Sequence, residues 1–208
     1  MLHVMNPSDT RSYNSPTREA QAAETRASIV EALFEQLYSE SLTDFSVPKV
    51  ARRAGVSTRT VYRYFPTRDD LLAAVEAHVQ QVAPEPAPPA DPLDAASFVG
   101  ELYAYFDRHS ELIEAQSRTR LGGEVMDLSR ARRRARNEPT IQQMFPDLDP
   151  RERLKRFAVV RALISSRTWR LMTREVGLST DEATEIVTWA IDTLAQQMDQ
   201  RSPPEEAP

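Results

Sequence analysis

Apolar residues recur at every third or fourth position in several long segments, and this helical period predicts an all-α protein. In the first such segment, over about residues 24–38 or beginning earlier, Ile29, Leu33 and Leu37 follow one another at four-residue steps, so one face is apolar. No segment alternates steadily between apolar and polar residues, so we expect almost no sheet. Residues 1–16 are polar and without periodicity, and are expected to form a disordered arm.

Two short helices with a glycine between them are predicted within residues 46–65. Ser46 is a candidate N-cap of the first helix, and Gly55 ends that helix at a position where a left-handed residue costs least. Ser57 caps the second helix, and Pro66 ends it because proline cannot continue the hydrogen-bond ladder. Two helices joined by such a tight turn form a helix-turn-helix.

The remaining pattern divides the chain into two helical domains. Thr67 and Asp70 resemble a capping box, which starts a helix through about Gln81. Further helices are expected over about residues 93–108, 110–120, 123–143, 150–174 and 180–200. Five prolines in ten residues mark an extended linker between the domains. The expected division is a helix-turn-helix domain with its connecting helix (17–82), the linker (83–92), a C-terminal domain (93–200) and a disordered tail (201–208).

The second helix of the helix-turn-helix has one apolar and one polar face. At 100° per residue, Val61 and Phe65 lie within about 40° of each other, so we expect both to face inward. Arg59 and Arg63 then point in nearly the opposite direction. Since arginine can pair bidentately with guanine O6 and N7, this outer face is suited to reading base edges in a DNA major groove.

The distribution of charge along the chain favours a local contact with DNA phosphates over a surface that is basic throughout. The formal net charge is −5, and the segment after residue 178 contains seven acidic residues and only one arginine. Between residues 45 and 68, by contrast, no acid occurs and there are six cations: Lys49, Arg52, Arg53, Arg59, Arg63 and Arg68. One short segment of an acidic protein is therefore electropositive.

The same segment carries a specific combination of residues. Ala-Gly-Val-Ser at 54–57 is followed by Tyr-x-Tyr-Phe at 62–65, by Arg68, and then by acids and leucines. This combination resembles the DNA-binding signature of the TetR family of transcription regulators, over about residues 24–75. The glycine common in that family between the first two helices is missing, and the loop at 38–44 looks a few residues longer. The resemblance implies base and phosphate contacts by Ser46, Lys49, Thr58, Arg59, Thr60, Tyr62, Arg63, Tyr64 and Arg68, the last at a position where a lysine usually grips the phosphate backbone.

The resemblance also implies a homodimer, because in this family the last two helices pair with their two-fold mates in a four-helix bundle. The candidate interface residues are Phe157, Val160, Leu163, Ile186, Val187, Ala190, Ile191 and Leu194. An ordinary intramolecular core is the alternative for these residues, and packing is the expectation for Trp189.

A cavity for a small-molecule effector is likewise implied in the C-terminal domain. Its candidate residues are Phe98, Tyr103, Phe106, Leu112, Gln116, Arg120, Met126, Ser166, Trp169 and Arg170. Each of these can equally be a core or surface residue. Five arginines lie within seven residues on one predicted helix: Arg130, Arg132, Arg133, Arg134 and Arg136. They form either a solvated or partly disordered segment, or a binding site for an anion such as an acyl-coenzyme A or an organic acid.

No pattern in the sequence indicates catalysis, a cofactor or a metal. Cysteine is absent, the three histidines (His3, His78 and His109) are scattered, and there is no Gly-x-Ser-x-Gly, phosphate-loop or His-Glu-x-x-His motif. No signal peptide or membrane-length apolar run is present, so we expect a cytoplasmic protein without a membrane partner.

The function expected from the sequence is that of a ligand-responsive repressor. Such a protein binds a palindromic double-stranded DNA operator as a homodimer and is released by a small-molecule effector. A regulator or architectural DNA-binding protein without a ligand is the alternative.

Overall fold

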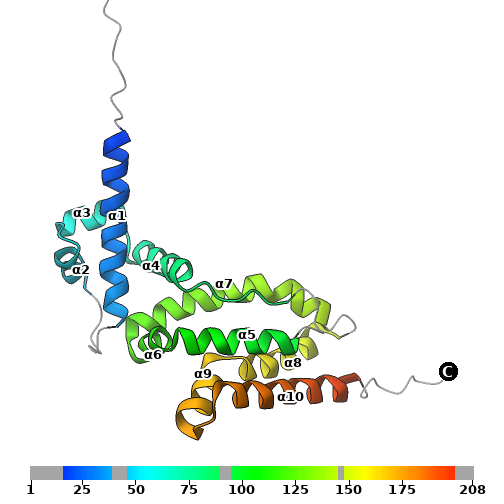
Figure 1. The fold of residues 1–208 in the computed structure, drawn as a ribbon. Helices are drawn as coiled ribbons and strands as arrows, with labels where there is room; N and C mark the ends of the chain where they lie inside the picture. The colour runs from blue at the N-terminus through cyan, green and yellow to red at the C-terminus, as the bar shows by residue number, and fades with distance from the viewer. Residues whose placement is uncertain (1–15, 39–45, 90–94, 145–147, 200–208) are drawn as a thin grey trace, which may run out of the picture.

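The computed structural model describes residues 16–38, 46–89, 95–144 and 148–199, and every regular element within these ranges is a helix (Figure 1). The predicted all-α class is therefore confirmed. Three predictions concern residues that lie outside the described ranges: the disordered arm apart from Pro16, the longer loop at 38–44 apart from Tyr38, and the disordered tail.

The N-terminal domain is built from α1 (Pro16–Leu37), α2 (Val47–Arg53), α3 (Thr58–Tyr64) and α4 (Arg68–Val82). Its core gathers the residues that the helical period assigned to inner faces: Ile29, Leu33, Leu37, Val50, Val61, Phe65, Leu71 and Val75. Helix α1 begins at Pro16, well before residue 24. The apolar pattern missed this first part because residues 17–28 are mostly exposed and polar, so they bury no face. Proline is well tolerated in the first turn of a helix.

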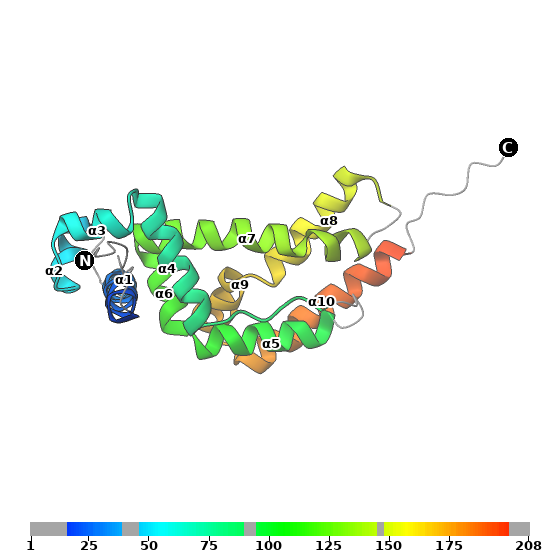
Figure 2. The ribbon, with the colours of Figure 1, turned by 90° about the horizontal axis from the view of Figure 1, so that it is seen from above.

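The C-terminal domain contains α5 (Ala95–Arg108), α6 (Ser110–Arg118), α7 (Arg120–Met144), α8 (Pro150–Leu163), α9 (Ser166–Arg170), the π-helical turn η2 (Leu171–Val176) and α10 (Thr180–Asp199). Helix α5 packs along α10, and α6 packs on α7. Helix α4 lies against both α1 and α7 and so connects the two domains. Figure 2 shows the helix-turn-helix at one end of an elongated molecule, with α8 and the end of α10 at the other.

The helix expected over residues 150–174 is interrupted. It ends at Leu163, and Ser165 caps a new helix by accepting a hydrogen bond from the Thr168 amide at 3.2 Å. A left-handed Gly177 (φ 88°) ends the π-helical turn that follows. Periodicity did not reveal the break, because serine both tolerates a helix interior and caps a new helix well.

Gly122 allows α6 and α7 to pack closely. A Cβ atom at this position would lie 2.3 Å from the Gln116 Cα atom, which is too close for two non-bonded carbon atoms. The segment over residues 83–89 contains no helix, as its prolines predict. It is anchored to the C-terminal domain, because the Tyr105 hydroxyl donates to the Ala83 carbonyl at 3.2 Å and Arg133 pairs with Glu85.

Candidate nucleic-acid interface

The turn between α2 and α3 has the predicted local geometry. Ser46 caps α2 by accepting from the Lys49 amide at 3.4 Å, and Ser57 caps α3 by accepting from the Thr60 amide at 3.1 Å. Gly55 has a φ of 67°, in the left-handed region that favours glycine. Local hydrogen bonds therefore start α2 and α3, and the left-handed glycine lies in the turn between them.

Helix α3 has the predicted inner and outer faces. Val61 and Phe65 are buried in the domain core, and the Arg26 guanidinium of α1 lies over the Phe65 ring, 4.9 Å from its centroid. Arg59 and Arg63 are exposed on the outer side, and 51% of Tyr62 is exposed between them. The exposed face thus offers two guanidinium groups and a phenol, with no acid on the helix.

Three other candidate DNA-binding residues on α3 have side chains that are partly buried or engaged within the protein. The Thr60 hydroxyl lies 2.9 Å from the Ser57 hydroxyl, so it is part of the helix cap. Thr58 is half-buried at the helix start. The half-buried Tyr64 ring packs against the core, and the Arg63 guanidinium lies over it at 5.1 Å from the centroid.

Two of the six cations in this segment form ion pairs within the protein. Arg53 pairs with Glu35 of α1, and Arg68 pairs with Glu124 of α7. Lys49, Arg52, Arg59 and Arg63 are exposed and make no ion pair with a carboxylate in the part of the chain that the structure describes. The available positive charge therefore lies on α2 and α3.

The start of α4 is linked electrostatically to α7. Glu124 lies 2.5 Å from Arg68 and 3.4 Å from Arg120, so two arginines share its carboxylate. The predicted capping box is present: the Thr67 amide donates to Asp70 at 3.0 Å, and the Asp70 amide donates to the Thr67 hydroxyl at 3.1 Å. Hydrogen bonds from Thr67 hold the pKa of Asp70 below its usual range. Sequence reasoning missed Glu124, because nothing in the local pattern relates it to a residue 56 positions away.

The effector candidates mostly form the core of the C-terminal domain. Tyr103, Phe106 and Trp169 are buried together, with centroid distances of 6.0 Å from the Phe106 ring to each of the other two. The Tyr103 hydroxyl donates to the Leu163 carbonyl at 2.8 Å, and burial raises the pKa of Tyr103. Leu112 and Gln116 are also buried.

The other effector candidates are scattered. Arg120 is exposed and pairs with Glu124, and the Met126 sulfur accepts from Arg130 at 3.2 Å. Phe98, Ser166 and Arg170 are half-buried.

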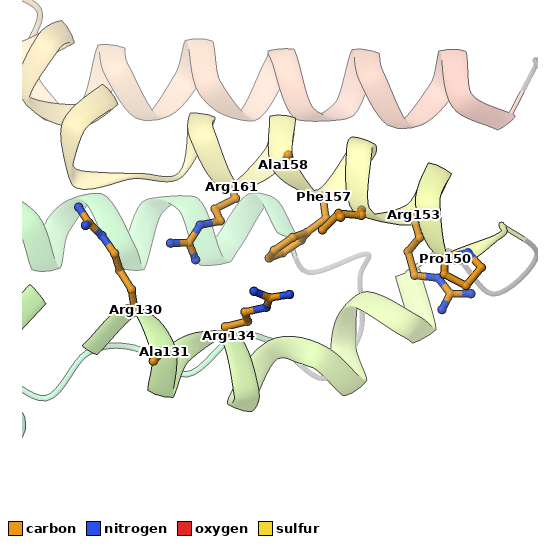
Figure 3. A pocket seen from close by; sticks show the side chains of 9 residues that line it. Arg130, Ala131, Arg134, Pro150, Arg153, Phe157, Ala158 and Arg161 are labelled. Atoms are coloured by element: carbon orange, nitrogen blue, oxygen red, sulfur yellow. The ribbon is translucent and has the colours of Figure 1, made fainter. Parts of the chain in front are cut away.

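A cavity of about 550 Å³ lies instead between α7 and α8, and none of the ten effector candidates lines it (Figure 3). Its walls are Arg130, Ala131, Arg134, Pro150, Arg153, Leu154, Phe157, Ala158 and Arg161. The sequence left Arg130 and Arg134 between a solvated or partly disordered segment and an anion site, and it implied Phe157 for the dimer. One signal for the α8 wall was present: Arg153, Phe157 and Arg161 recur at four-residue steps and so share a face.

The arginine-rich stretch of α7 divides between two faces. Arg132 pairs with Glu76 of α4 at 3.0 Å, and Arg133 pairs with Glu85 at 2.9 Å. Both carboxylates are largely buried, so these two arginines connect α7 to α4 and to the segment after it. The prediction of a solvated segment is therefore wrong for Arg132 and Arg133. Arg134, by contrast, is exposed and lines the cavity.

The predicted dimer residues do not share one surface. Val187 (0% exposed) and Ile191 (6% exposed) are buried inside the protomer, so they belong to its core and cannot form an interface surface. Ile186 is 43% exposed on another side of α10. Trp189, expected to pack, is 62% exposed beside it. Phe157, Val160, Leu163, Ala190 and Leu194 are half-buried.

Within the described residues, no cluster of three or more potential metal ligands is found. No described helix is both long enough and apolar enough to cross a membrane.

Comparison with known proteins places this geometry in a family context. Residues 29–75, from the middle of α1 to the middle of α4, match the model for bacterial regulatory proteins of the tetR family. A curated relative is the HTH-type transcriptional repressor DrrR1 of Streptomyces coeruleorubidus, 32% identical over 116 residues. The match covers 54% of this chain and 43% of that relative, so the chain spans less than half the length of the curated protein.

Two solved structures match this chain over most of its length. A protein of Pseudomonas aeruginosa PAO1, described provisionally as a transcriptional regulator, has a TM-score of 0.58 at 19% identity; the match covers 91% of this chain and 96% of that one. A TetR transcriptional regulator of Rhodococcus sp. RHA1 has a TM-score of 0.46 at 22% identity, covering 85% of this chain and 97% of that one. The first of these likenesses supports the fold over nearly the whole chain. Residues 29–75, which include the helix-turn-helix, therefore match the tetR family of bacterial regulatory proteins, and the fold of nearly the whole chain is similar to that of the Pseudomonas protein.

Proposed function

We propose that this protein is a transcription repressor, which binds a palindromic operator in double-stranded DNA as a homodimer and is released by a small-molecule effector bound to its C-terminal domain. The observation that carries the proposal is the outer face of α3, where Arg59, Tyr62 and Arg63 are exposed. The opposite face of the helix is buried in the domain core through Val61 and Phe65. The Streptomyces relative is named a transcriptional repressor, which supports repression as the sign of regulation.

The proposed contacts follow from side-chain chemistry and exposure. Arg59 and Arg63 read base edges in the major groove, because a guanidinium can pair with guanine in two hydrogen bonds. Tyr62 contacts a base or the backbone beside them. The remaining residues position the domain on phosphates, either through side chains or through amides at the starts of α2 and α3: Ser46, Lys49, Thr58, Thr60, Tyr64 and Arg68.

A homodimer is proposed because one helix-turn-helix contacts too few base pairs for specific binding in a genome. Helix α8 contains no fully buried residue, and α10 exposes Ile186 and Trp189. Large exposed apolar side chains on the terminal helices are typical of a surface that is covered in an assembly. Two recognition helices in such a dimer need a spacing of about 34–36 Å to enter successive major grooves.

Helix α4 is the proposed route from the effector to DNA. It starts beside the recognition helix and carries Arg68 at its first turn and Glu76 further along. Both side chains pair with residues of α7, namely Glu124 and Arg132. A shift of α7 on effector binding therefore changes the position of α4 and the spacing of the two recognition helices.

The Glu124→Gln variant is expected to bind operator DNA more tightly, by about threefold. The substitution removes the carboxylate that competes with phosphate for Arg68, together with one negative charge near the duplex. The dependence of affinity on salt should become steeper, because one more cation neutralises phosphate. Fluorescence anisotropy with a labelled duplex at several salt concentrations measures both effects.

The matched control for this experiment is Glu114→Gln, since Glu114 pairs with Arg174 at 3.6 Å within the C-terminal domain. This control should leave affinity unchanged. Equal or weaker binding by Glu124→Gln at every salt concentration would show that Arg68 does not exchange Glu124 for phosphate.

Selection of bound fragments from the source genome tests the proposed function as a whole. We expect enrichment of a two-fold symmetric sequence, a footprint over two half-sites one helical turn or a multiple of it apart, and weaker binding as salt rises. Enrichment of no sequence over random fragments would contradict the proposal, and an asymmetric single site would contradict the dimer.

A further inference from the structure

The cavity between α7 and α8 has charged and apolar walls that face each other. Figure 3 shows Arg134 projecting from α7, and Arg161 and Phe157 projecting from α8, into the space between the two helices. The volume of about 550 Å³ lies within the range typical of small-molecule sites, about 300–1,000 Å³. The apolar part of the wall comes from Ala131, Pro150, Leu154, Phe157 and Ala158.

The charge in this cavity is one-sided. Four arginines and no aspartate or glutamate occur among its lining residues. Arg130 is paired with Asp127 at 2.6 Å, and Arg153 donates to the Leu148 carbonyl at 2.9 Å. Arg134 and Arg161 form no ion pair with a carboxylate in the described part of the chain. Two guanidinium groups therefore face the cavity without a counter-charge of their own.

The surroundings of Arg161 reinforce this imbalance. Burial and the positive charges of three α7 arginines lower the pKa of its guanidinium, while Glu85 opposes the shift. Glu85 is itself engaged by Arg133 at 2.9 Å and by Arg136 at 3.7 Å. An anion bound between the two helices would relieve the repulsion among these cations.

We propose that this cavity is a binding site for an amphipathic organic anion, whose carboxylate or phosphate lies between Arg134 and Arg161 and whose apolar body packs on Phe157 and Leu154. Planar guanidinium groups can bind either head group, because a carboxylate or a phosphate can accept two parallel hydrogen bonds from one guanidinium. Bound DNA is a poor occupant, since Figure 2 shows α8 at the end of the molecule opposite α3. That this anion is the effector of the repressor rests on the proposed function, whereas the binding site itself does not.

Isothermal titration of the full chain with three eight-carbon probes tests the site: octanoate, octyl phosphate and 1-octanol. We expect at least one anionic probe to bind at least about tenfold more tightly than the alcohol, since a hydrogen bond to a charged group is stronger than one between neutral groups. The ratio between the carboxylate and the phosphate identifies the preferred head group. Equal affinity for all three probes, or no heat with any of them, overturns the proposal.

The Arg134→Gln/Arg161→Gln variant should lose at least about tenfold in affinity for the anionic probe while its affinity for 1-octanol stays unchanged. The matched control is Arg151→Gln/Arg156→Gln, which also removes two positive charges in total, both at positions of α8 that do not line the cavity. The thermal melt of each variant reports folding, and the exposed Arg134→Gln alone serves as a second variant. A loss as large in the control, or none in the cavity variant, overturns the assignment.

Operator binding measured on the same samples separates the two proposals. Octanoate or octyl phosphate should weaken operator binding by the wild type and leave the cavity variant unaffected. Arginine-dependent binding of the probe without any effect on DNA supports the site and contradicts its role as the effector site. Failure to bind any operator contradicts the proposed function, while the titrations still decide the site.

Discussion

The Tyr62→Ala/Arg63→Ala variant should bind its operator about 100-fold more weakly than the wild type, since two proposed contacts of about 1–3 kcal/mol each are lost. Both side chains are exposed on the outer face of α3 and contribute little to the core. The buried anchors Val61 and Phe65 and the Ser57 cap remain, so the helix keeps its position. Quantitative footprinting measures the loss, and the thermal melt should stay close to that of the wild type.

The specificity of this effect depends on a comparison with a distant arginine. Arg118→Ala removes a cation that is also exposed, at the end of α6, and should change operator affinity by less than about twofold. Binding to unrelated duplexes should fall much less in the α3 double variant than binding to the operator, because part of the loss is base readout. If the α3 double variant gave the same footprint as the wild type at the same protein concentration, α3 would not be part of the DNA-recognition surface.

The second large effect is expected from an exposed stripe of α10. Ile186 and Trp189 lie three residues apart, on a different side of the helix from the buried Val187 and Ile191. The Ile186→Glu/Trp189→Glu variant should be monomeric, because four carboxylates would face one another in a two-fold interface without partners. Light scattering coupled to size-exclusion chromatography gives the mass directly.

Loss of the dimer should weaken operator binding by about 100-fold or more, because the second half-site then binds without the effective concentration that the linked partner supplies. Leu128→Glu is the control, since it places the same charge on an exposed apolar position of α7. This control should remain dimeric and bind DNA normally. A dimeric Ile186→Glu/Trp189→Glu variant would move the interface away from this stripe of α10.

The helix-turn-helix could be predicted in detail because its determinants are local. The Ser46 and Ser57 caps, the left-handed Gly55 and the capping box of Thr67 each act within three or four residues of chain. The burial of Val61 and Phe65 follows from helical geometry once the helix limits are known. Sequence reasoning therefore gave the right orientation for the exposed arginines.

The C-terminal domain was predicted less well, because helical periodicity shows that a face is apolar and not what covers it. Helix α10 has two apolar stripes, and only the packed structure shows that Val187 and Ile191 face the protomer core while Trp189 is exposed. Aromatic residues implied for an effector cavity proved to be core, since Tyr103, Phe106 and Trp169 pack on one another.

By itself, the sequence determined the helical class, the place of the recognition helix and the side of it that is exposed, because caps, turns and helical period depend on neighbouring residues. Only the tertiary structure decided which charges neutralise one another. Glu124 with Arg68 and Glu76 with Arg132 each join residues 56 positions apart. The same packing left Arg134 and Arg161 beside a cavity without a carboxylate. Ion pairing depends on distances of a few ångströms between helices, and those distances are set by the packing of the whole chain.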